Sequence, residues 1–138
     1  MERLTDPQTW YVVLDRSHEG RGWWKPFLHK QFQHVILYCD MGGFIIQYNP
    51  LSHATAIMKH EISMEALLLH EVQRGVTAIL SYTVYYGAIY KRAYIEPYTC
   101  VSAAKRLLGI RSRLFTPKAL YHELIRAGAL VIKPYCIT

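Results

Sequence analysis

The sequence predicts an α+β fold in which an antiparallel sheet is packed with two to three helices. Two strand-like runs joined by Asp40-Met41-Gly42-Gly43 indicate a β-hairpin. Other segments place apolar residues at helical spacing behind capping residues, or alternate β-branched and tyrosine residues as strands do. No repeat, low-complexity segment or linker divides the 138 residues, so we predict a single domain over residues 1–138.

The expected elements follow in chain order. Residues 10–15 are β-branched and aromatic, which predicts a first strand. Residues 16–30 contain turn residues and predict a loop, in which Trp23-Trp24 either cover an edge of the core, line a pocket or form a binding surface. After the hairpin we expect, in order, a short strand over 55–58, a helix over 63–75, strands over 76–86 and 88–95, helices beginning near residues 100 and 117, and an edge strand over 129–132.

The hairpin is formed by residues 33–39 and 44–49. Side chains alternate along a strand, so His34 shares a face with Ile36 and Tyr38. A turn centred between residues 41 and 42 places His34 opposite Asn49, and a slip of two residues brings Gln47 there instead. In either register, His34 has an amide partner on its own face.

Cys100 begins the helix that follows Pro97. Thr99 has the side-chain oxygen of an N-cap, which places Cys100 at the first helical position. The unpaired N–H groups and the dipole of a helix N-terminus both favour a thiolate over a thiol. The alternative is a small apolar cysteine buried at the start of a helix, which is a common use of this residue.

Cys100, His34 and an amide supply the three groups of a cysteine hydrolase or acyltransferase. The chemistry needs a nucleophile at a helix N-terminus, a histidine to exchange its proton and a polar group to orient the imidazole. Asn49 or Gln47 serves as the third group. The alternative for His34 is a ring that caps the hairpin and bonds to backbone.

Cofactor, metal and disulfide chemistry are not predicted. Cys39, Cys100 and Cys136 lie far apart without a Cys-x-x-Cys pair, which argues against a disulfide framework and a structural zinc site. The sequence contains no His-x-x-x-His pair and no phosphate-binding loop. The net charge of +6 is compatible with nucleic acid, but the basic residues are scattered, so a nucleic-acid-binding module is only the third hypothesis.

The order of elements resembles the circularly permuted branch of the papain-like amidase superfamily, which includes the NlpC-type cell-wall peptidases. The matching segments are residues 34–38, residues 44–49, and Thr99-Cys100-Val101 through Leu108. The resemblance implies a papain-like (permuted NlpC-type) fold and a cysteine peptidase or amidase that cleaves an amide or isopeptide bond in a peptide or peptidoglycan-like substrate. It also implies that Cys100 is the nucleophile, His34 the base and Asn49 or Gln47 the orienting group, with the Cys100 N–H in the oxyanion hole. Thr99-Cys100-Val101-Ser102 replaces the Asn-Cys-Glu-His of the acyltransferase-type members of this superfamily, the lecithin–retinol acyltransferase-like proteins, so lipid acyl transfer is not supported.

Residues 100–110, followed by Thr116-Pro117, are also similar to short bacterial and phage-encoded proteins. The second hypothesis is therefore a catalytically silent structural, assembly or docking module on the same fold, for instance a virion component with other phage proteins as partners. No apolar run is long enough to span a bilayer and no signal peptide is evident, so we expect the protein in the cytoplasm or within a virion or other particle.

Overall fold

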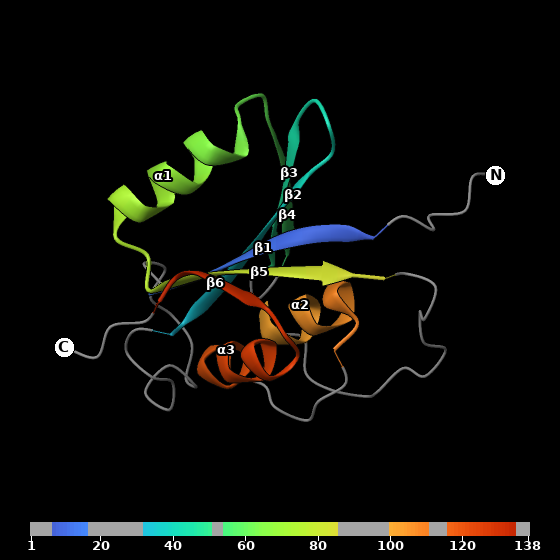
Figure 1. Cartoon of the computed structure of the whole chain (residues 1–138), viewed down its shortest axis with the longest axis vertical. Helices are drawn as coiled ribbons and strands as arrows, with labels where there is room; N and C mark the ends of the chain where they lie inside the picture. The colour runs from blue at the N-terminus through green and yellow to red at the C-terminus, as the bar shows by residue number, and fades with distance from the viewer. Residues whose placement is uncertain (1–6, 17–31, 51–53, 86–99, 111–115, 135–138) are drawn as a thin grey trace.

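The computed structural model describes residues 7–16, 32–50, 54–85, 100–110 and 116–134. These residues form a six-stranded antiparallel sheet in the order β4-β3-β2-β1-β5-β6, together with three helices (Figure 1). The strands are β1 (Gln8–Asp15), β2 (His34–Asp40), β3 (Ile45–Pro50), β4 (Thr55–His60), β5 (Ala78–Val84) and β6 (Leu130–Lys133). The helices are α1 (Met64–Arg74), α2 (Cys100–Leu108) and α3 (Pro117–Arg126). The α+β class and the antiparallel sheet are confirmed.

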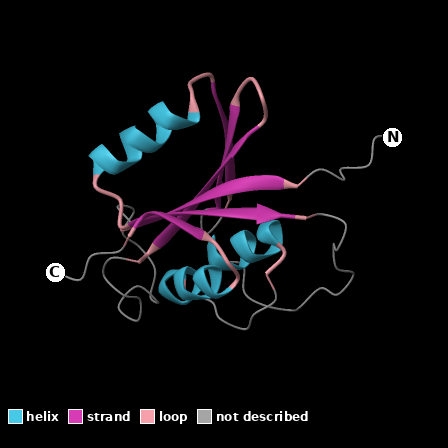
Figure 2. Ribbon diagram, in the orientation of Figure 1, coloured by secondary structure: helices cyan, strands magenta, loops and turns pink. Residues whose placement is uncertain are grey.

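Helices cover both faces of the sheet, with α1 on one face and α2 and α3 on the other (Figures 1 and 2). Val35 and Leu37 of β2 pack in the cluster that includes α2 and α3, whereas Ile36 and Tyr38 pack in the cluster that includes Leu67 of α1. A strand buried on both sides needs apolar residues at consecutive positions. This explains the uninterrupted apolar runs in β1 and β2.

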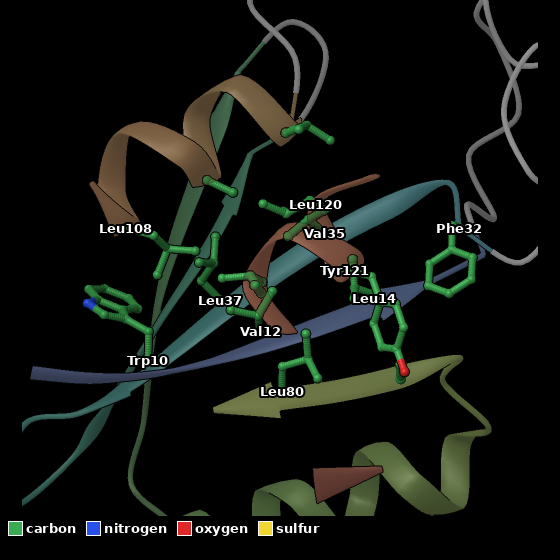
Figure 3. Packing of buried hydrophobic residues seen from close by; sticks show 14 of the residues in the cluster. Trp10, Val12, Leu14, Phe32, Val35, Leu37, Leu80, Leu108, Leu120 and Tyr121 are labelled. Carbon is green, nitrogen blue, oxygen red and sulfur yellow. The ribbon is translucent and has the colours of Figure 1, made fainter. Parts of the chain in front are cut away.

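The larger cluster joins the centre of the sheet to α2 and α3. Figure 3 shows side chains of β1, β2 and β5 gathered against those of the two helices. Leu14, Leu37, Leu80 and Leu124 are among its fully buried members. This packing holds the N-terminal end of α2, and therefore Cys100, against β2.

The predicted helix ends are confirmed for α1 and α3. Ser63 Oγ accepts from the Ala66 N–H at 3.1 Å, and Thr116 Oγ1 accepts from the Ala119 N–H at 3.2 Å. Gly75 ends α1 at φ +83°, a left-handed conformation that strains other residues. Thr99, the predicted cap of α2, lies outside the described residues, as do Trp23-Trp24 and the strand predicted over 88–95.

The hairpin is confirmed, but neither of the two registers considered for it is observed. Tyr38 pairs with Gln47, and Asp40 pairs with Ile45. The turn is therefore centred between Gly42 and Gly43, where the Asp40 carboxylate accepts from the Gly42 N–H at 2.9 Å. The register differs by an even number of residues, so each side chain keeps its predicted face.

Candidate active site

His34 and Asn49 form a direct side-chain pair at one end of the sheet. His34 begins β2, Asn49 lies near the end of β3, and the His34 Nε2 is 2.6 Å from the Asn49 Oδ1. In the observed register Asn49 aligns with Ile36, so this contact runs diagonally between the strands. An amide oxygen only accepts hydrogen bonds, so the Nε2–H donates, and whenever the ring is neutral its lone pair is on Nδ1.

Gln47, the other candidate for the orienting group, pairs with a different histidine. Its Oε1 is 2.6 Å from the Nε2 of His60, which ends β4. The sequence left Asn49 and Gln47 as alternatives, and the structure pairs Asn49 with His34. The His60 pair was not predicted, because it depends on the pairing of β3 with β4.

Cys100 begins α2, where it is half-buried and packs against the cluster that contains Val35 and Leu37. Burial raises the pKa of the Cys100 thiol, and the backbone N–H groups of Val35, Val101 and Cys100 itself oppose this effect. The predicted influence of the helix terminus is therefore present, but burial exceeds it. Burial therefore acts against the thiolate that the helix terminus is expected to favour.

Cys100 lies near the start of β2, the strand that His34 begins. The sulfur lies near the backbone N–H of Val35, the residue that follows His34. Strand alternation directs His34 to the face of Ile36 and Tyr38, whereas Cys100 packs on the face of Val35. The two side chains therefore lie on opposite faces of the sheet near the N-terminal end of β2.

A buried charged cluster lies under α1 on the face that His34 shares. Arg74 Nη1 is 2.6 Å from Asp15 Oδ2, Arg74 also pairs with Glu71 Oε2, and the Tyr38 hydroxyl donates to Glu71 Oε1 at 3.0 Å. Burial, followed by the nearby Glu71 charge, raises the pKa of Tyr38 well above its usual range. Sequence reasoning missed this cluster, although Glu71 lies four residues after the buried Leu67 and therefore on the same helix face.

Within the described ranges, no three His, Cys, Asp or Glu residues are grouped closely enough to hold a metal ion. None of the helices in those ranges is long and apolar enough to cross a membrane.

No family model, curated protein or solved structure matches this chain.

Proposed function

We propose that this protein is a papain-like (permuted NlpC-type) thiol hydrolase that cleaves an amide or isopeptide bond in a peptide or peptidoglycan-like substrate. The observation that carries the proposal is the hydrogen bond from His34 Nε2 to Asn49 Oδ1. It fixes the ring and gives Nδ1 the lone pair that a general base needs. Cys100, near the first residues of the same strand, is the nucleophile.

The raised pKa of the Cys100 thiol favours a general-base mechanism over a resting ion pair. As the sulfur of Cys100 attacks the acyl carbon, Nδ1 of His34 takes the thiol proton around the N-terminal end of β2, where the two faces of the sheet meet. The imidazolium then gives this proton to the amine as the carbon–nitrogen bond breaks. Water hydrolyses the thioester, with His34 accepting and returning a proton, and the free thiol is restored.

Two features of the site stabilise the charges that develop during this reaction. The Asn49 oxygen accepts from the Nε2–H, and this bond strengthens when the ring becomes an imidazolium. The Cys100 N–H has no acceptor within its own helix because it belongs to the first turn, so it is a donor for the oxyanion.

The direct test is hydrolysis of peptidoglycan fragments and isopeptide-linked peptides by wild type, Cys100→Ala and Cys39→Ala. Cys39 is a buried cysteine on β2, which makes its variant a matched control for loss of a thiol. We expect Cys100→Ala to lose turnover and Cys39→Ala to retain it. Turnover by Cys100→Ala equal to that of wild type would contradict the proposal.

The second candidate is a catalytically silent docking module, such as a virion component that joins other phage proteins. The observation that favours it is the exposed apolar side chains of the edge strand β4, where Ile57 is 66% exposed and Met58 50%. On this hypothesis Ile57→Asp abolishes incorporation into the particle, whereas Cys100→Ala has no effect. The cytoplasm or a virion is the proposed location in either case.

A further inference from the structure

Asp15 is the cross-strand neighbour of His34. The two residues are paired at the end of the β1–β2 ladder, and directly paired residues point to the same face of a sheet. The Cβ atoms of such pairs are about 5 Å apart. The Asp15 side chain is 7% exposed, so water screens its charge only weakly.

Both carboxylate oxygens of Asp15 are engaged by other groups. Oδ1 accepts from the backbone N–H of Arg16 at 2.7 Å, and Oδ2 accepts from Arg74 at 2.6 Å. Asp15 is therefore held in place beside His34, where its charge acts on the imidazole.

Arg74 is shared between two buried carboxylates. It pairs with Asp15 and with Glu71, whose side chain is 5% exposed. One guanidinium between two ionised carboxylates leaves a single net negative charge in the cluster. A negative charge near an imidazole favours the imidazolium form.

On this basis, and resting on the proposed function, we propose that Asp15, Glu71 and Arg74 are positioning residues that set the basicity of His34. The two carboxylates raise the affinity of the ring for a proton, and Arg74 limits that increase. Residues of α1 thereby help to set the basicity of His34, although α1 lies on the face of the sheet opposite to the nucleophile helix α2.

Among the described residues, the charged and titratable groups on this face include Tyr11 and Asp15 of β1, Tyr38 of β2, His60 of β4, Glu71 and Arg74 of α1, and Lys133 of β6, whose ammonium donates to the Val76 carbonyl. Tyr38 stays neutral because its pKa is raised, and His60 is bonded to Gln47. Asp15 is the charged group paired directly with His34, and Arg74 is its salt-bridge partner, so these are the two residues whose charge the experiment changes.

The experiment is an NMR titration of His34, identified among the 7 histidines by the resonance that His34→Gln loses. Asp15→Asn removes the nearest negative charge and should lower the titration midpoint by about one pH unit. Arg74→Gln removes the positive charge and should raise it by a similar amount. Arg74→Lys keeps the charge and should restore a midpoint close to that of wild type.

Tyr38→Phe is the matched structural control, because it removes a buried hydrogen bond of the same cluster without changing its charge. Its midpoint should equal that of wild type. If Arg74→Gln does not fold, the comparison of Asp15→Asn with Tyr38→Phe still decides the question. Unchanged midpoints, or shifts of the same sign in Asp15→Asn and Arg74→Gln, overturn the proposal.

The titration needs no substrate, so it is independent of the test of function. Loss of turnover in Cys100→Ala tests the hydrolase, and opposite midpoint shifts test the charged cluster. If both hold, the acid limb of kcat/KM against pH should move with the His34 midpoint in each variant. An acid limb that stays fixed while the midpoint moves excludes the cluster from setting the base of the reaction.

Discussion

Asn49→Ala tests the orienting hydrogen bond of the candidate site. The bond from His34 Nε2 to Asn49 Oδ1 is 2.6 Å long and joins a charged donor to a neutral acceptor once the imidazolium forms. Hydrogen bonds to charged groups contribute about 1.5–3 kcal/mol. At about 1.4 kcal/mol for each tenfold change in rate, kcat should fall about 10- to 150-fold. Because the bond is stronger in the charged state, the loss should fall on kcat more than on KM.

Gln47→Ala is the matched control for this variant. Gln47 is also an amide of β3, and its oxygen lies at the same distance, 2.6 Å, from a histidine, but that histidine is His60. Turnover on the substrate that wild type hydrolyses should therefore stay within about threefold of wild type, a change of well under 1 kcal/mol. The reverse pattern, with Gln47→Ala impaired and Asn49→Ala active, would refute the assignment of Asn49. Circular dichroism of both variants shows whether the sheet is retained.

Three further predictions concern the thiol, the tyrosine and the core. Because burial raises the pKa of Cys100, its alkylation by iodoacetamide should be slow at pH 7 and accelerate above the usual thiol pKa of about 8.5. An alkylation rate that is already maximal at pH 7 would contradict a raised pKa. The raised pKa of Tyr38 means that the folded state holds this proton more tightly than the unfolded state, so the free energy of unfolding should fall as the pH rises through about 10. Tyr38→Phe should remove that part of the decline in urea titrations at pH 9 to 11, and an identical decline in both proteins assigns it to another group. Leu14→Ala, at a fully buried position of β1, should cost about 2–5 kcal/mol in urea unfolding at pH 7, whereas Ile57→Ala at an exposed position should cost less than about 1 kcal/mol.

Local chemistry made several elements predictable from the sequence. The hairpin was found because Asp40, Gly42 and Gly43 are turn residues between two β-branched runs. The starts of α1 and α3 were found because Ser63 and Thr116 are caps, and their side chains accept from the predicted part of each helix. These signals lie within a few residues of the structure that they determine.

Alternation also placed the partner of His34 on the correct face before the register was known. Asn49 and Gln47 have the same parity, so a shift of two residues could not remove the amide from that face. The register itself depends on how four turn residues fold and how β3 pairs with β4. The pairing of Asn49 with His34, and of Gln47 with His60, could therefore be read only from the folded sheet.

The charged cluster shows the limit of sequence reasoning in this chain. Asp15, Glu71 and Arg74 are separated by up to 59 positions, and they meet only because α1 packs on the face of β1 where Asp15 ends the strand. No pattern in a single sequence shows that residues so far apart along the chain are in contact.

At Cys100, the sequence alone determined a thiol at the start of an amphipathic helix, because caps and periodicity are local properties of the chain. The tertiary structure raises the pKa of this thiol, because its burial against β2 depends on the packing of α2 and α3 and exceeds the opposing effect of the nearby N–H groups. It also decided that His34 and Cys100 approach the start of β2 from different faces of the sheet. The residue types of the candidate site are thus a property of the sequence, whereas their protonation and placement are a property of the fold.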